Sequence, residues 1–246
     1  MEKVAYLTID DCPTPSLKRK LDILLARNIP AVLFCSGQQL EALPKQAHYA
    51  IEKGFIIGNH AYDHPHFSAI PLETCLEQID RTDAIIDDLY TDAGVPRPVK
   101  WFRFPYGDKG ALTGDDLFGE RTAAGQARYE AIQNHLRKIG YTKPRFENIT
   151  YDYYREYLQD AVDWFWTYDV MEWSIYEAEP MFGIDSPEKM FARMDENEPE
   201  EGRGLNDPHS AEIILTHDHL ASDELFEPII ERLLTKDLVF EAPPLA

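Results

Sequence analysis

Short apolar runs alternate with longer amphipathic stretches along most of the 246 residues. The apolar runs are short and end at polar or turn-forming residues, which is typical of strands buried in a parallel sheet. They lie at residues 4–9, 31–35, 55–58, 100–104, 164–168, 212–216 and 238–240. The stretches between them carry apolar residues at helical spacing, at 14–28, 39–54, 72–94, 127–140, 186–197 and 222–237. The alternation predicts an α/β fold with a parallel sheet, open or closed.

Proline, glycine and small polar residues mark where several of these helices begin and end. Thr14 before Pro15 and Ser186 before Pro187 are typical of an N-cap followed by proline at the first helical position. Pro44 is expected to interrupt the helix over 39–54. Three helices are expected to stop at glycines, namely Gly54, Gly94 and Gly140.

Seven predicted strands without an obvious break in composition favour one domain over two. The length of 246 residues is normal for a single (β/α) barrel. We therefore predict one catalytic domain, residues 1–246, built as a (β/α)7 barrel. Residues 107–163, first glycine-rich and then rich in tyrosine and aspartate, are interpreted as an insertion that carries extra helix.

Charge and cysteine content narrow the possible partners. A formal net charge of −20 argues against binding to nucleic acid or to an anionic membrane, although it also serves solubility alone. Cys12, Cys35 and Cys75 form no C-x-x-C pair, so we expect reduced thiols. No long apolar segment follows Met1, and no stretch is apolar enough to span a bilayer. These features predict a cytoplasmic protein, or a periplasmic or secreted one if a leader has been removed.

Ionisable residues gather where the predicted strands end. In parallel α/β folds the carboxyl ends of the strands share one rim, and chemistry is usually located there. Five strands end in such residues, which are Asp10 and Asp11, His60 with His64, Arg103 with Tyr106, Asp169, and His217. Matched residue types at five strand ends are unlikely by chance, so we predict one polar site at this rim.

The stretch GNHAYDHPHF, residues 58–67, is either a histidine-rich surface turn or a source of two metal ligands. His60 and His64, four positions apart, suit a metal on one face of a turn. With an aspartate they would make a three-ligand site that leaves a position open, as a hydrolytic zinc centre requires. Adjacent carboxylates on an extended chain point in opposite directions, so one of Asp10 and Asp11 would ligate and the other take a proton. His217 is then available as an acid.

Five segments occur in the order of a known set of motifs: TIDDCP (8–13), HAYDHP (60–65), RFPYG (103–107), DVMEW (169–173) and LTH (215–217). Together they resemble the motifs of the polysaccharide deacetylases, the NodB-like enzymes of carbohydrate esterase family 4. The resemblance implies a distorted (β/α) barrel, a divalent metal that is usually zinc, and hydrolysis of an N-acetyl group from an amino sugar.

The resemblance also implies a role for each matching residue. Asp10 would be the general base and His217 the general acid. Arg103 would orient Asp10, and Asp169 would hold His217. The remaining positions would be the metal ligands Asp11, His60 and His64, the backbone N–H of Tyr106 facing the oxyanion, and Trp173 and Leu215 lining the acetyl pocket.

Two positions depart from the family pattern. Cys12 stands where the family usually has glycine, and its side chain would narrow the pocket, ligate, or pack; we favour packing. Ala61 replaces a serine or threonine and removes a hydroxyl. We interpret His66 and His219 as neighbours of the motif residues rather than ligands.

The main hypothesis is a metal-dependent amidohydrolase that removes an acetyl group from a small or oligomeric N-acetylated sugar. One alternative keeps the fold but cleaves another non-peptide C–N amide bond. Another is a non-catalytic carbohydrate-binding protein on the same scaffold. The substrate, its chain length, the metal in vivo and the oligomeric state are left open.

Overall fold

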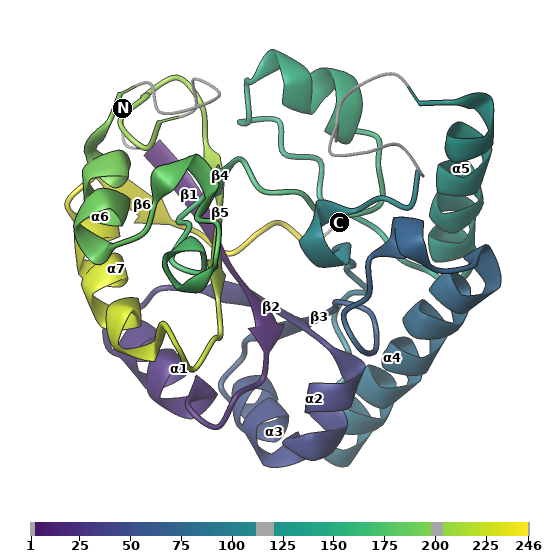
Figure 1. Cartoon of the computed structure of the whole chain (residues 1–246). Helices are drawn as coiled ribbons and strands as arrows, with labels where there is room; N and C mark the ends of the chain where they lie inside the picture. The colour runs from purple at the N-terminus through teal and green to yellow at the C-terminus, as the bar shows by residue number, and fades with distance from the viewer. Residues whose placement is uncertain (1–2, 112–120, 198–203, 246) are drawn as a thin grey trace.

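The computed structural model describes residues 3–111, 121–197 and 204–245. Five parallel strands lie in the order β3-β2-β1-β5-β4, and a sixth, β6, pairs with the start of β1. The strands lie in the middle of the molecule, and most of the helices lie around them (Figure 1). The strand bounds are β1 Lys3–Cys12, β2 Ala31–Cys35, β3 Ile56–Asn59, β4 Tyr168–Asp169, β5 Glu212–His217 and β6 Leu238–Phe240.

The central strand β1 is nearly entirely buried, which explains why the sequence reads there as a continuous apolar run rather than an alternating one. It pairs with β5 over Ala5–Asp10 and with β2 over Leu7–Cys12. In this register Asp10 lies opposite His217 of β5. Two of the predicted polar strand ends therefore meet at one point of the rim.

Two predicted strands are much shorter than the pattern suggested. The run at 100–104 pairs only through Phe102, which bridges Asn59 on one side and Asp163 on the other. The run at 164–168 contributes only the two-residue strand β4, paired with β5. The segment from Asp163 to Asp169 thus contacts Phe102 at its start and β5 at its end, so the strands follow a distorted, incompletely paired barrel.

Helices connect successive strands in the manner of βα units. Their bounds are α1 Leu17–Ala26, α2 Gly37–Ala42, α3 Pro44–Glu52, α4 Leu72–Asp92, α5 Ala123–Lys138, α6 Pro187–Asp195 and α7 Phe226–Leu234. Short 3-10 turns lie at Phe67–Ala69, Pro105–Gly107, Ser174–Tyr176, Met181–Gly183 and Asp223–Leu225, and one π-turn at Tyr154–Leu158. The α/β prediction and the parallel sheet are confirmed.

The predicted helix boundaries hold at most positions. Pro44 separates α2 from α3, Ser186 caps α6 by accepting a hydrogen bond from the Lys189 N–H, and three helices stop just before glycines with positive φ. The prediction that Thr14 caps the first helix was wrong. Ser16 occupies the N-cap position, and the Thr14 hydroxyl instead binds the carboxylate of Asp218 at 2.9 Å.

The described parts of 107–163 are integrated into the core. Helix α5 lies beside the long helix α4 (Figure 1) and connects the strand-like segment at Phe102 to that at Asp163, as a regular barrel helix would. Ile132 and Leu136 of α5 are fully buried, and Tyr154 of the π-turn packs in the cluster that contains Trp164. The prediction of extra helix within residues 107–163 is confirmed by α5, and this helix packs against the core. Residues 112–120 lie outside the described residues.

Within the described part of the chain, no helix is long and apolar enough to cross a membrane.

Candidate metal and acid–base site

A β-bulge places both aspartates of the first motif in the site. Along β1, Asp10 pairs with Phe34 and Cys12 with Cys35, so Asp11 is skipped in the register. Asp11 adopts a left-handed backbone conformation with φ 60°. Bulges re-aim side chains in this way beside active sites. The strict alternation of an extended strand is broken here, and both carboxylates come within 3.6 Å of Nε2 of His60.

His60 and His64 approach each other through a loop and not through a helical turn. Ala61 and His64 both have positive φ, and the loop is fixed by hydrogen bonds from the Ala61 N–H to the Asn59 side chain and from the Gly37 N–H to the Ala61 carbonyl. The two imidazole rings lie 4.9 Å apart. Chain spacing therefore predicted that these two histidines lie together, although not the loop geometry that joins them.

Asp11, His60 and His64 form a cluster of the kind that holds a divalent cation. Their ligand atoms lie within 4.8 Å of one another, with Nε2 of His64 3.1 Å from Oδ1 of Asp11. Nδ1 of His60 is engaged at 2.8 Å with the carbonyl of Arg103, which leaves Nε2 facing the cluster. This arrangement matches the second-sphere hydrogen bond that usually orients a metal-binding histidine.

The protonation states also suit metal binding. Burial lowers the pKa of both His60 and His64 to about 4, and the charge of Asp11 opposes this only in part. Burial alone would raise the pKa of Asp11, but a hydrogen bond from His219 and the nearby imidazoles hold it well below its ordinary value. At neutral pH the cluster thus offers two neutral imidazoles and one carboxylate, the forms that bind a cation.

Asp10 is buried, and Arg103 holds one of its two carboxylate oxygens. Nη1 of Arg103 donates to Oδ1 of Asp10 at 2.7 Å and to the Thr8 hydroxyl at 2.8 Å. The guanidinium lies 4.3 Å above the ring of Phe34, so it has little freedom to move. Burial raises the pKa of Asp10, and Arg103 offsets this only partly. The other oxygen, Oδ2, faces the cluster and is available to accept a proton.

His217 is held by Glu172, which the sequence analysis did not single out. Oε1 of Glu172 accepts from both Nδ1 and the backbone N–H of His217, at 3.1 and 2.5 Å. Burial lowers the pKa of His217, but the charge and hydrogen bond of Glu172, together with Asp169, outweigh it and raise the pKa to about 10. The imidazole is consequently protonated at neutral pH. The sequence did contain a signal for this role, because Glu172 is the acidic residue directly before Trp173 in the motif DVMEW.

Asp169 lies beside Glu172 and His217, but its carboxylate accepts hydrogen bonds from other residues. Its carboxylate accepts from the Met171 N–H at 2.8 Å and from Nε1 of Trp173 at 3.0 Å. Asp169, Glu172 and His217 still place ligand-type atoms within 4.8 Å of one another. Asp169 therefore acts on His217 through its charge, and Glu172 through a direct hydrogen bond.

The other predicted residues also lie at this rim. The Tyr106 ring is exposed and lies 4.4 Å from the ring of His64 and 3.8 Å from that of His66, nearly parallel to it. The ring of Trp173 meets that of His217 edge-on at 6.4 Å. Leu215 is buried in β5 opposite Asp169. The structure thus gathers all the predicted site residues at one end of the sheet.

Cys12, the departure from the family pattern, points into the core. Its thiol is fully buried and donates to the carbonyl of Ile9 at 3.4 Å, and burial raises its pKa well above the ordinary value. A buried, protonated thiol is inert both as a ligand and as a nucleophile. Of the readings offered for Cys12, packing is the one this geometry supports.

A cation fits this donor set. Nitrogen from two imidazoles and oxygen from one carboxylate are the usual ligands of a catalytic zinc ion, which keeps a further position open. The fit rests on the free Nε2 of His60, which its Arg103 contact turns toward the cluster, and on the closeness of the three donors.

The first half of the chain is similar to proteins of a known family. The family model for polysaccharide deacetylases matches residues 1–132. The chain is 34% identical over 103 residues to a peptidoglycan-N-acetylglucosamine deacetylase of Bacillus cereus, and 30% identical over 89 residues to the peptidoglycan-N-acetylmuramic acid deacetylase PdaC of Bacillus subtilis. These alignments cover 42% and 36% of the chain, but only 36% and 19% of the length of the two relatives.

Solved structures resemble the whole chain. A family 4 carbohydrate esterase from Streptomyces lividans, in complex with acetate, has a TM-score of 0.58 at 20% identity, covering 99% of this chain and 94% of its own. A family 4 pseudoenzyme from Bacillus anthracis has a TM-score of 0.59 at 18% identity, covering 96% and 62%. At these identities the likeness shows the fold alone, and an enzyme and a pseudoenzyme share it equally.

Proposed function

This chain belongs to the polysaccharide deacetylase family, and on that basis we propose that it is a metal-dependent amidohydrolase that removes the acetyl group from an N-acetylated amino sugar or oligosaccharide. The observation that carries the proposal is the convergence of Asp11, His60 and His64 beside the buried carboxylate of Asp10 and the imidazole of His217, which Glu172 holds. The curated relatives named above as peptidoglycan deacetylases support the substrate class. The resident cation is proposed to be zinc.

Asp11, His60 and His64 would hold the cation. When bound, a divalent cation at such a site polarises the substrate carbonyl and makes water more acidic. The ligand atoms need no large movement, because they already lie within 4.8 Å of one another.

Asp10 is proposed as the general base. Arg103 holds Oδ1, so the carboxylate is fixed in orientation while Oδ2 faces the cluster, 3.6 Å from Nε2 of His60. A base must lie within hydrogen-bond reach of the proton that it removes, directly or through water. The raised pKa of Asp10 makes it a stronger base than an exposed aspartate.

His217 is proposed as the general acid. Because Glu172 engages Nδ1, the proton on Nε2 is the one available to the departing amine. Protonation of the nitrogen lets the C–N bond break to release a neutral amine. The N–H of Tyr106 is proposed to bind the developing oxyanion, and Trp173 with Leu215 to enclose the acetyl methyl, as the family resemblance implies.

The proposal is tested by measuring acetate release before and after metal removal. Protein stripped with a chelator and then reloaded with one equivalent of Zn²⁺ or Co²⁺ is incubated with chitooligosaccharides, peptidoglycan fragments and monomeric N-acetyl amino sugars. We expect acetate release from at least one class, lost on stripping and restored on reloading. Release of ammonia or formate without acetate would favour cleavage of another amide, and saccharide binding without any turnover would favour a carbohydrate-binding protein.

A further inference from the structure

His219, which is outside the proposed catalytic set, lies between the proposed metal ligand Asp11 and the proposed acid His217. Nε2 of His219 is 2.7 Å from Oδ2 of Asp11, and the His219 ring stacks on that of His217 at 5.0 Å with 27° between the planes. An ionised carboxylate only accepts hydrogen bonds, so Nε2 of His219 carries the proton and donates it. From the sequence, His219 was predicted to be a neighbour of the motif residues rather than a ligand.

This hydrogen bond divides the two oxygens of Asp11 between different partners. Oδ1 faces His64 at 3.1 Å and His60 at 3.6 Å, while Oδ2 is taken by His219. Among the residues that the structure describes, the metal-type cluster consists of Asp11, His60 and His64, and His219 is not a member. His219 therefore contacts a ligand but is not placed as one.

The backbone around Asp11 makes such a contact useful. Asp11 is a bulge residue in the left-handed conformation, so no cross-strand pairing with β2 fixes it. Among the residues that the structure describes, His219 donates a hydrogen bond to Oδ2 of this carboxylate, and His64 faces Oδ1 at 3.1 Å. His219 thus fixes the side of the carboxylate that lies away from the two histidines of the cluster.

The segment that carries His219 is itself braced against the Asp11 loop. Asp218 is fully buried, pairs with Lys20 at 2.8 Å and accepts from the Thr14 N–H at 2.6 Å. The Asp218 N–H donates to the carbonyl of Asp10 at 2.8 Å, and Lys20 also donates to the His219 carbonyl at 3.4 Å. A positioning contact works when its support is rigid, and this support is buried and hydrogen-bonded.

We propose that His219 is a positioning residue for the metal site: it binds Oδ2 of Asp11 so that Oδ1 alone is presented to the cation. The inference rests on the proposed function, because it assumes that Asp11 is a ligand. Partners of metal ligands typically change metal affinity by about 10- to 100-fold when they are removed. Removing His219 should therefore change metal affinity by a similar factor, although His219 supplies no ligand atom.

The test is a metal titration of the full, metal-free chain with Zn²⁺ against a chelating indicator, and with Co²⁺ followed by its visible absorption. His219→Ala is compared with His219→Gln, whose amide can still donate to Oδ2, and with His209→Ala, an exposed histidine before β5, as a control. We expect His219→Ala to weaken affinity about 10- to 100-fold, His219→Gln to recover much of the loss, and His209→Ala to bind as wild type does. The Co²⁺ band pattern should be the same in wild type and His219→Ala, because the number of protein ligands is unchanged.

Three results would overturn the inference alone: equal affinity of wild type and His219→Ala, no recovery in a folded His219→Gln, or a Co²⁺ spectrum in His219→Ala that shows the loss of a ligand. A wild-type chain that binds neither cation would overturn the proposed function and this inference with it. The two failures are thus distinguished by the wild-type titration.

Discussion

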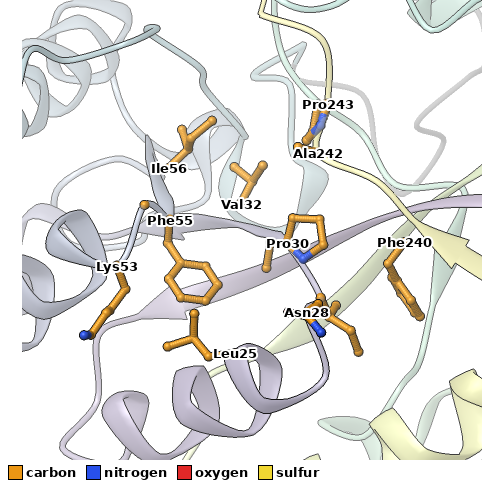
Figure 2. A pocket seen from close by; sticks show the side chains of 13 residues that line it. Leu25, Asn28, Pro30, Val32, Lys53, Phe55, Ile56, Phe240, Ala242 and Pro243 are labelled. Atoms are coloured by element: carbon orange, nitrogen blue, oxygen red, sulfur yellow. The ribbon is translucent and has the colours of Figure 1, made fainter.

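The two ends of strands β2 and β3 differ in the residues that surround them. At the carboxyl ends, side chains with charge or hydrogen-bonding groups are buried around a cation-type cluster, among them Asp10, His60, Arg103 and Glu172. At the amino ends of β2 and β3, the chain instead surrounds a cavity of about 440 Å³. Figure 2 shows that the labelled side chains around this cavity, such as Leu25, Pro30 and Phe55, are largely apolar. Along β2 and β3, the polar cluster and this largely apolar cavity thus lie at opposite ends, whereas β1 and β5 bury the ion pair of Lys3 and Glu212 at their amino ends.

The backbone shows the same contrast. The turns at the amino end place Asn28, Gly54 and Asp237 at positive φ, and these residue types tolerate that conformation. The loops of the site place Asp11, Ala61, His64, Tyr106 and Met171 there. For the alanine, the tyrosine and the methionine this conformation is unfavourable; it costs about 1–3 kcal/mol per residue and is concentrated at functional sites. In the two regions compared, this chain therefore accepts local strain beside the reacting groups and avoids it in the turns at the amino end.

Replacing Asp10 by Asn should have the largest effect, and this effect should be confined to the catalytic step. The amide keeps the size of the side chain but cannot accept a proton, so we expect kcat to fall by about 10³-fold, within the range for loss of a general base. Metal affinity should change little, because Asp11 and the two histidines remain. Steady-state acetate release and metal titration check this, and turnover within tenfold of wild type would refute the base assignment.

Replacing Phe55 by Ala at the opposite end should affect stability and not chemistry. Phe55 is 6% exposed and lines the amino-end cavity, so its removal enlarges an existing void. We expect the free energy of unfolding to fall by about 3 kcal/mol. Denaturant unfolding measures the loss, and kcat is measured at a temperature where the variant is folded. A kcat that changes by more than about threefold would show that the two ends are coupled, and that the amino-end cavity is not separate from catalysis.

Replacing Glu172 by Gln should have a smaller effect on rate and a clear effect on its pH dependence. Burial lowers the pKa of His217, whereas Glu172, Asp169 and Asp11 raise it to about 10, and the rings of Trp173 and His219 face the same imidazole. An acid that must be protonated supports turnover below its pKa and loses it above. Loss of the Glu172 charge lowers that pKa, so the alkaline limb of the kcat profile should move to lower pH by about one unit or more.

At pH 7 we expect kcat of Glu172→Gln to fall by only about tenfold, because Asp169 still contributes its charge. Glu179→Gln, an exposed acid in the same loop, is the matched control and should keep the wild-type profile. An alkaline limb that is unmoved in Glu172→Gln would mean that His217 is not the acid.

Much of the fold was predictable because it depends on local pattern. Buried apolar runs placed β1, β2, β5 and β6 within a few residues, and glycine and proline placed most helix ends. The short pairing at Phe102 and at β4 was not predictable, since aromatic runs such as WFWTY look like strands whether or not their backbone finds a partner. Helix α5 was predicted, but its position between the segments at Phe102 and Asp163 was not, because the irregular sequence around it suggested only an insertion with extra helix.

The site was predictable in residue type and less so in geometry. Strand-end reasoning brought Asp11, His60 and His64 to one rim, and the structure places them together. The bulge at Asp11 could not be foreseen, because residue alternation carries no sign of a skipped pairing. Glu172 and His219 were passed over since their importance lies in contacts between β5 and its neighbouring loops, which are distant in sequence.

The most direct test of the central claim is to locate the cation itself. A crystal of the zinc-loaded chain, measured at the zinc absorption edge, should give one strong anomalous peak about 2.0–2.2 Å from an oxygen of Asp11 and from Nε2 of His60 and of His64. Such a peak would show that these three side chains are the metal ligands. A peak held by other side chains, or no peak in a chain loaded with one equivalent of zinc, would contradict it.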